Sequence, residues 1–209
     1  MSSPGQVAKI STIQGVTNFI SRQMKTLMRI QPTELEGVVV IEPRVFSDAR
    51  GYFLETYNAK AFAEAGITAQ FVQDNQSQSR RGVLRGLHYQ LEQAQAKLVR
   101  VLAGEIFDVV VDLRPGSKTF GKWSGHILSA AEEKMIWIPK GFAHGFYTIS
   151  ETAKVAYKVT EYYAPLHERT LLWNDPQLAI AWPLEGEPIL SEKDKAGHSF
   201  KEFSRLAQD

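Results

Sequence analysis

Short apolar runs alternate with turn signals from Val38 onward. The runs are rich in Val, Ile, Phe, Tyr and Trp, and segments such as 47–51, 114–117 and 139–141 carry residues that favour turns. This spacing predicts a mainly β chain, built as an antiparallel sandwich or barrel. The strands that we expect are 38–42, 52–57, 70–74, 83–90, 97–103, 105–113, 122–128, 135–138, 145–149 and 154–161.

Helical segments are few in this pattern. Asn58 can cap a helix over 59–65, and Gly66 can end it. Near the C-terminus, Ser191 can start a short helix, and 199–206 has the pattern of a short amphipathic turn or helix. We therefore expect a few short helices beside the strands.

Polar side chains occupy phases of the predicted strands that hydrophobic residues otherwise fill. In 105–113, Asp108 and Asp112 share one face with hydrophobic residues, and Lys97 and Tyr157 are in phase with the valines of their own strands. Polar groups in such phases are typical of a cavity whose walls are otherwise apolar. Edge strands tolerate the same mixture, so this pattern alone leaves both interpretations open.

Length and composition indicate one compact globular domain. The chain has 209 residues, of which 44% are hydrophobic and 22% are charged. The net charge of +1 gives no sign of a nucleic-acid or membrane partner, so any anion recognition must be local. The absence of cysteine excludes disulfides, thiolate nucleophiles and cysteine-ligated zinc.

Residues 1–27 differ from the rest of the chain. They contain three basic residues and several serines but no acidic residue, which fits either a transit-like segment or an upstream start before Met28. We treat them as an N-terminal extension of unknown role and 28–209 as a single domain. The extension lacks the apolar core of a secretory signal, and no apolar stretch reaches the about 18 residues of a membrane span. We expect a cytoplasmic protein.

The segment GSKTFGKW at 116–123 approaches the phosphate-binding Walker loop. That loop needs Ser or Thr after its Lys and a helix to follow, whereas Trp123 stands in that place and a strand is expected next. We therefore interpret this segment as a hairpin turn.

The segment PKGFAH at 139–144 has the form PxGxxH, in which a turn lets His144 project from the start of a strand. Taken alone, His144 is better explained as a hydrogen-bonded core histidine. The motif resembles the second motif of the cupins, whose metal-binding members add an HxH pair and a Glu. The matching segment here is His88-Tyr89-Gln90, which lacks the second histidine, so a metal centre is disfavoured.

The segment VLRGLHYQ at 83–90 is the most informative stretch of the chain. Together with 48–55, 71–75, 96–100, 107–112, 137–146 and 190–194, it resembles the dTDP-4-dehydrorhamnose 3,5-epimerase family. The likeness runs from about residue 37 to residue 194.

This resemblance implies a cupin-type jelly-roll barrel, or double-stranded β-helix, with a few short helices. It implies an epimerase that needs no cofactor or metal and acts on dTDP-4-dehydro-6-deoxy-D-glucose, a precursor of dTDP-L-rhamnose. The enzyme would remove a proton beside the C4 ketone and return one from the opposite face. The family pairs subunits through exchanged or extended sheets, so we expect a homodimer, with 38–42 as an apolar candidate for the contact.

The resemblance also assigns roles by position. His88 matches the general base, Asp194 the carboxylate that orients it, Tyr157 the proton donor and Lys97 the cation beside the enolate oxygen. The positions that match substrate contacts are Arg85 at the diphosphate, Tyr163 at the thymine ring, and Arg50, Glu55, Gln73, Asp74, Asn75, His144, Glu168 and Lys193. Asp108 is a weaker candidate to orient His144.

Other interpretations of these residues stay open. Without the family, Arg50, Glu55, Glu168 and Lys193 would be solvated surface charges. A single-centre epimerase resembles this family throughout, so His88 and Tyr157 do not exclude it. A third alternative is a non-catalytic cupin that binds sugar nucleotides.

One difficulty lies in the spacing of Arg85 and His88. They are three positions apart, so an undistorted strand would point their side chains to opposite faces. Gly86 offers a bulge that would bring both into one cavity, and we therefore predict irregular strand pairing at this point.

Overall fold

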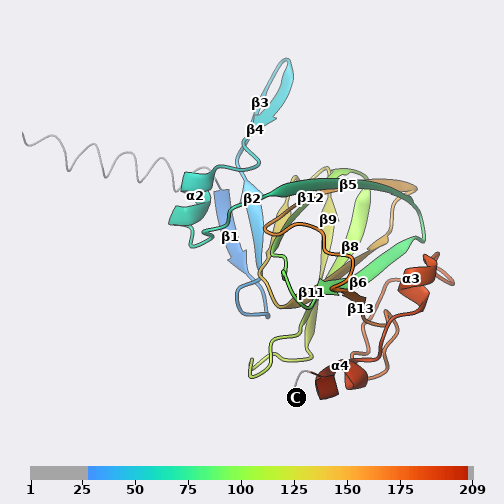
Figure 1. The fold of residues 1–209 in the computed structure, drawn as a ribbon. Helices are drawn as coiled ribbons and strands as arrows, with labels where there is room; N and C mark the ends of the chain where they lie inside the picture. Colours follow the sequence, from blue (N-terminus) through green and yellow to red (C-terminus); the bar gives the residue numbers. More distant parts are fainter. Residues whose placement is uncertain (1–27, 207–209) are drawn as a thin grey trace, which may run out of the picture.

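The computed structural model describes residues 28–206, which form two facing antiparallel sheets (Figure 1). The six-stranded sheet has the order β1 (Met28–Pro32), β2 (Val39–Pro43), β10 (Met135–Ile138), β7 (Lys97–Ala103), β12 (Thr152–Val159) and β5 (Gln73–Arg80). The five-stranded sheet has the order β13 (Glu168–Thr170), β6 (Leu84–Gln90), β11 (Phe142–Thr148), β8 (Glu105–Asp112) and β9 (Trp123–Ser129). The predicted jelly roll is confirmed. Residues 1–27, predicted to be an extension, lie outside the described part.

Hydrophobic residues fill three layers around these sheets. The first cluster lies between the sheets and includes Val99, Val110 and Phe146. The second packs the outer face of the five-stranded sheet against the C-terminal segment, which contributes Leu171 and Phe200. The third lies beneath α2 on the outer face of the six-stranded sheet. On each strand, the residues in phase with members of the first cluster therefore point into the barrel, and we call them the barrel-facing row.

The short helices agree with the sequence pattern. In α2 (Ala59–Glu64), the side chain of Asn58 accepts hydrogen bonds from the first-turn amides, as predicted for its cap. In α3 (Glu192–Lys195), Ser191 caps the helix in the same way. The expected segment 199–206 forms α4 (Phe200–Leu206), which packs on the barrel.

Several strand predictions need correction. The prediction of a strand over 70–74 was wrong in position, because β5 begins at Gln73 and runs through the polar segment QSQSR, which carries no hydrophobic alternation. The predicted strand 52–57 is confined to the hairpin strand β4 (Gly51–Leu54), and β11 begins at Phe142 instead of 145. The strands β1, β3 (Val45–Asp48) and β13 were not predicted, because each is too short for a clear period.

The hairpin of β3 and β4 stands apart from the barrel. Its two strands pair only with each other among the described residues, and Figure 1 shows them projecting away from both sheets. Its aromatic residues Phe46, Tyr52 and Phe53 are exposed. The apolar strand that we expected at a subunit contact, β2, pairs with β1 on one edge and β10 on the other. It therefore has no free edge with which to extend a sheet.

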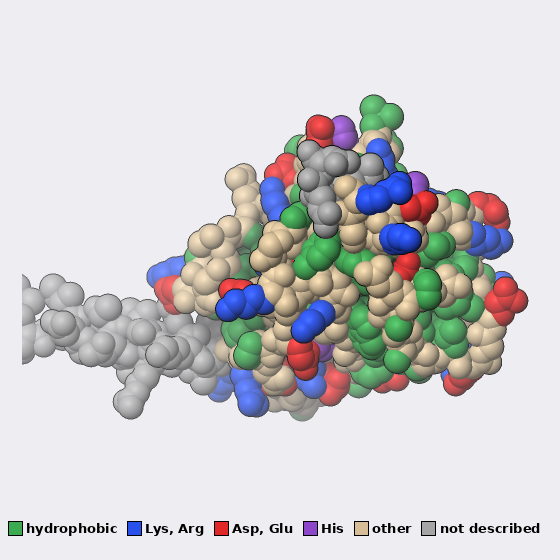
Figure 2. All heavy atoms as spheres, turned by 90° about the horizontal axis from the view of Figure 1, so that it is seen from below, with side chains coloured by type: hydrophobic (Ala, Val, Ile, Leu, Met, Phe, Trp, Pro, Cys, Tyr) green, Lys and Arg blue, Asp and Glu red, His purple; other side chains and the backbone are tan. Residues whose placement is uncertain are grey.

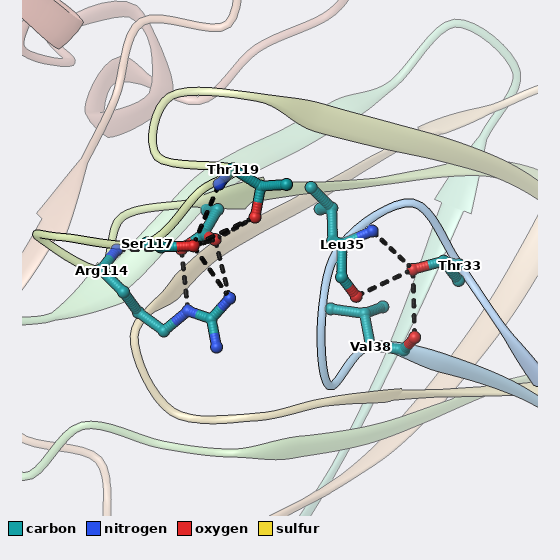
Figure 3. Close-up of polar contacts among 7 residues, drawn as sticks. Thr33, Leu35, Val38, Arg114, Ser117 and Thr119 are labelled. Carbon is teal, nitrogen blue, oxygen red and sulfur yellow. Dashed lines mark hydrogen bonds and ion pairs between the residues drawn. The ribbon is translucent and has the colours of Figure 1, made fainter.

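The segment after β8 is a turn built around Asp112, whose side chain is fully buried. Its carboxylate accepts hydrogen bonds from Arg114, Ser117 and Thr119, and Figure 3 shows these three residues close together in the turn. These bonds outweigh burial and lower the pKa of Asp112 to about 2. The following residues form β9, so the hairpin interpretation of 116–123 is confirmed.

The described surface carries charges of both signs. Figure 2 shows one face on which Lys, Arg, Asp and Glu side chains are interspersed with apolar ones. None of the helices within residues 28–206 has the length and apolarity to cross a membrane.

Candidate active site

A cavity of about 530 Å³ opens between the two sheets. One part of its wall is polar, and the other part is apolar and reaches the C-terminal helix α4 at Phe203. Seven of the predicted site residues line it: Gln73, Asn75, His88, Lys97, Tyr157, Tyr163 and Glu168.

His88 forms a dyad with Asp194, although 106 residues separate them in the chain. The Nε2 atom of His88 lies 2.6 Å from Oδ1 of Asp194, and Ser191 donates to Oδ2 at 2.6 Å. Burial alone would raise the pKa of Asp194, but the hydrogen bonds from His88 and Ser191 hold it below its ordinary value. A charged carboxylate is therefore fixed against the imidazole.

The imidazole of His88 is partly buried, with 26% of its side chain exposed. Burial lowers its pKa below 6.5, although the hydrogen bond with Asp194 opposes this change. At neutral pH the ring is therefore uncharged and able to accept a proton, as a general base must be.

The predicted irregularity at Gly86 is confirmed. On the paired strands, His88 is opposite His144 and Arg85 is opposite Phe146, so β6 carries one extra residue between these pairs. A Cβ on Gly86 would lie 2.5 Å from the Cα of Gly145, so only glycine permits this approach of the two backbones. The bulge turns Arg85 and His88 to the same face.

Arg85 is exposed and does not line the cavity. Its Nε atom donates to Oγ of Ser79 at 2.9 Å, and its guanidinium donates to the carbonyl of Gln78 at 3.3 Å. Its charge reaches Tyr157, because it lowers the pKa of that phenol against the larger opposing effect of burial. An anion bound at Arg85 would therefore lie close to the polar part of the cavity.

Lys97 and Tyr157 lie on neighbouring strands, and both point into the barrel. Their strands β7 and β12 are paired, and both residues stand in rows that continue into the core between the sheets. Burial lowers the pKa of Lys97 to about 8, against the opposing charges of Asp108 and Glu168. Burial raises the pKa of Tyr157, which keeps its phenol protonated at neutral pH.

The mouth of the cavity carries an ionic network of Tyr163, Glu168 and Lys193. Tyr163 donates to Glu168 at 2.7 Å, and Lys193 forms an ion pair with Glu168 at 2.8 Å. Burial would raise the pKa of Glu168, but these bonds lower it overall. The aromatic ring of Tyr163 is 52% exposed and is available for stacking against a planar group.

His144 is buried and does not line the cavity. It is 7% exposed and pairs through Nε2 with Oδ2 of Asp108 at 2.7 Å. It is therefore a hydrogen-bonded core histidine as well as the strand neighbour of His88.

Three further residues that match substrate contacts lie away from the cavity of their own chain. Arg50 is at the tip of the β3–β4 hairpin and pairs with Asp48. Glu55 accepts from Asn58 beside α2. Asp74 points out of the barrel and pairs with Lys158 at 2.8 Å, because neighbours on a regular strand face opposite sides.

Sequence reasoning missed several residues of the site. Ser79, which orients Arg85, follows Asn75 at period two along β5, and this signal was lost because the segment was not recognised as a strand. The apolar wall, which includes Leu113, Phe142 and Phe203, comes from segments far apart in the chain. Among residues 28–206, no cluster of three His, Cys, Asp or Glu residues is arranged to hold a metal ion.

Comparison with known proteins identifies the family. The profile of the family described as dTDP-4-dehydrorhamnose 3,5-epimerase matches residues 32–202. This chain belongs to the dTDP-4-dehydrorhamnose 3,5-epimerase family. A relative of that name from Pseudomonas aeruginosa is 57% identical over 174 residues, which are 83% of this chain and 96% of the relative.

Solved structures of epimerases share the fold. A dTDP-6-deoxy-D-glucose-3,5-epimerase from Legionella pneumophila, in complex with dTDP-4-keto-L-rhamnose, has a TM-score of 0.82 and 54% identity, covering 83% of this chain and 93% of its own. A 3'-monoepimerase from Streptomyces bikiniensis, in complex with dTDP-quinovose, has a TM-score of 0.79 and 34% identity, covering 84% and 90%. The 3,5-epimerase family thus has structural neighbours that are named for one centre.

Proposed function

We propose that this protein is a dTDP-4-dehydrorhamnose 3,5-epimerase, which converts dTDP-4-dehydro-6-deoxy-D-glucose into dTDP-4-dehydro-L-rhamnose. The observation that carries the proposal is the dyad of His88 and Asp194 at 2.6 Å, on a cavity that Tyr157 and Lys97 also line. Family membership and the matching 3,5-epimerases support the substrate.

The proposed reaction is a proton exchange beside the C4 ketone. His88 takes a proton from the carbon next to the carbonyl, and Asp194 stabilises the charged imidazole that results. Lys97 stabilises the negative charge on the enolate oxygen, where the buried site makes its charge more effective than in water. Tyr157 returns a proton from the opposite face. The ketone itself acidifies the neighbouring carbon, so this sequence of steps needs no further cofactor.

Recognition of the nucleotide would involve the rim of the cavity. Arg85 suits the diphosphate, because a guanidinium binds phosphate oxygens through charge-assisted hydrogen bonds. Tyr163 suits the thymine ring, and the polar row of Gln73 and Asn75 on β5 suits the sugar hydroxyls.

Proton NMR of the presumed substrate in deuterium oxide tests the reaction. A 3,5-epimerase incorporates deuterium at both C3 and C5, and the label should appear together with the L-configured product. An absence of label at both carbons, with the nucleotide still bound, would favour the non-catalytic binding protein.

The specific alternative is a single-centre epimerase, which the likeness to the 3'-monoepimerase favours. The same NMR experiment separates the two, because a single-centre enzyme would label either C3 alone or C5 alone. Label at both carbons rules it out.

We also infer a homodimer in the cytoplasm. Arg50 and Glu55 match substrate contacts but lie outside their own cavity, and the exposed aromatic hairpin that carries Arg50 suits a second copy of the chain. Light scattering after size exclusion should give twice the chain mass, and Phe53→Asp should shift the protein toward the monomer. A wild-type monomer would contradict this inference. The cysteine-free composition supports the compartment.

A further inference from the structure

The barrel interior holds a second histidine–carboxylate pair, Asp108 and His144, that the proposed reaction does not use. They come from the adjacent strands β8 and β11, and Nε2 of His144 lies 2.7 Å from Oδ2 of Asp108. Asp108 is completely buried. A fully buried carboxylate is costly, so its surroundings should show what compensates it.

The second oxygen of Asp108 has no hydrogen-bond partner. Within residues 28–206, Oδ1 of Asp108 and Oγ1 of Thr148 are the buried side-chain atoms left without one. Buried oxygens of this kind are rare and call for a specific explanation. His144 satisfies only Oδ2, so a positive charge elsewhere in the interior would compensate Oδ1 without a direct hydrogen bond.

Lys97 is a cation on the facing sheet, and its charge and that of Asp108 act on each other. Asp108 stands in the barrel-facing row of β8 between Ile106 and Val110, and Lys97 continues the barrel-facing row of β7 that holds Val99. The two side chains therefore enter the same interior from opposite walls. The charge of Asp108 is the strongest of those that favour the ammonium form of Lys97.

The other carboxylates near this interior are already engaged. Glu168 accepts from Lys193 and Tyr163, and Asp112 accepts from Arg114 and its turn. The like charge of Lys193 lowers the pKa of Lys97. The remaining titratable or charged groups on the barrel-facing rows are Arg85 and His88 on β6, His126 on β9, His144 on β11 and Tyr157 on β12.

We propose that Asp108 is the internal counter-ion of Lys97 and a positioning residue of the active site, which keeps the lysine protonated and holds the ring of His144. This rests on the proposed function only in giving Lys97 a role at the enolate oxygen. Without Asp108, burial would remove the proton from Lys97 at a lower pH. The enolate would then lose its cation within the working range of the enzyme.

Titration of Lys97 in the ligand-free protein tests this directly. Competitive acetylation at a series of pH values, read by mass spectrometry, gives the apparent pKa of Lys97 without any substrate. We expect Asp108→Asn to lower it by about 1 pH unit or more, since a nearby opposite charge contributes that much. The matched control is Asp112→Asn, on the same strand and face, which should leave it unchanged. An unchanged pKa in the Asp108 variant, or equal shifts in both, overturns the proposal.

A measurement on the wild-type fold covers the case in which the Asp108 variant does not fold. The carboxyl ¹³C resonance of Asp108 should shift near pH 8 as Lys97 loses its proton, and Lys97→Met should abolish this inflection. The resonance of Asp112 should show no inflection there. Absence of the inflection for Asp108 in the wild type overturns the proposal.

A kinetic measurement then links Lys97 protonation to turnover. In Asp108→Asn, the alkaline limb of kcat/KM should move to lower pH by the same amount as the Lys97 titration, and Asp108→Glu should restore it. A lower rate with an unmoved limb would indicate a merely structural role and overturn the positioning role. Failure of the epimerase assay itself would leave the substrate-free titration as an independent result.

Discussion

Asp108 and Asp112 lie four residues apart on β8, face the same interior and are both fully buried, yet they have opposite surroundings. The partners of Asp112 lie within seven residues of it, and both of its oxygens are bonded. The partner of Asp108 is 36 residues away, and one of its oxygens has none. A carboxylate that is hydrogen-bonded by its own turn stabilises the local fold. A carboxylate whose partner comes from a distant segment lies in the interior that those segments enclose.

The position along the strand explains this difference. Asp112 ends β8, so the chain folds back and brings hydroxyl and guanidinium donors to its carboxylate. Asp108 is in mid-strand, where its sequence neighbours point to the other face and only adjacent strands or the facing sheet can reach it.

The largest expected effect is on the reaction rate, at His88, whose partner Asp194 is distant in the chain. We predict that His88→Ala lowers the rate of deuterium uptake by about 10²- to 10⁴-fold, the range for loss of a general base, with little change in thermal stability. Asp194→Asn should act in the same direction. His198→Ala, at an exposed histidine outside the cavity, is the control. Full deuterium exchange in both dyad variants would refute the assigned base.

The next largest effect is on stability, at Asp112, whose hydrogen-bond partners lie in its own turn. Asp112→Asn should lower the free energy of unfolding by about 3 kcal/mol, because it leaves buried donors of the turn with a weaker acceptor. Chemical denaturation measures this change, and kcat/KM of the folded fraction should match the wild type. A loss of activity beyond the unfolded fraction would erase the distinction between the two carboxylates.

The same residue predicts the acid stability. The pKa of Asp112 is about 2 in the folded state, against 3.8 for an ordinary aspartate, so the unfolded state binds the proton more readily. The stabilisation is therefore present above pH 3.8 and is lost as the pH falls from there toward 2. Denaturation curves over this range should converge for the wild type and Asp112→Asn. Parallel curves would show that the carboxylate charge is not the cause.

A smaller effect concerns the pH–rate profile. His88 must be uncharged and Lys97 charged, so kcat/KM should fall below the lowered pKa of His88 and above about 8, where Lys97 loses its proton. Each limb should approach about a tenfold change per pH unit. A plateau that continues past pH 9 would show that the charge of Lys97 is not required.

The smallest effect is expected for Asp74, which faces outward beside the cavity-lining Asn75. Asp74→Asn should change the free energy of unfolding by less than about 1 kcal/mol, since it removes an exposed ion pair with Lys158. Its kcat/KM should stay within about twofold of the wild type, whereas Asn75→Ala should lower it further. A larger loss for Asp74 would place it at a site completed by a second copy.

Much of the arrangement could be predicted from single segments. Most strands of the barrel, the cap at Asn58, and the inward phase of Lys97 and Tyr157 follow from local sequence patterns. The bulge at Gly86 followed from the need to place Arg85 and His88 on one face. The polar strand β5 could not be found in this way, because both of its faces are polar and alternation disappears.

The sequence by itself determined which residues can form strands, which glycine can bend one, and which side chains can carry protons, because these properties depend on a residue and its near neighbours. The family resemblance implied that Asp194 meets His88, and the tertiary structure brings the two together. Only the tertiary structure decided that Asp74 faces away from the cavity that Asn75 lines, and that Asp108 keeps one oxygen unbonded. Protonation and charge at these positions are set by burial and by partners that lie up to 106 residues away in the chain. Such partners come together only when the sheets close around a common interior.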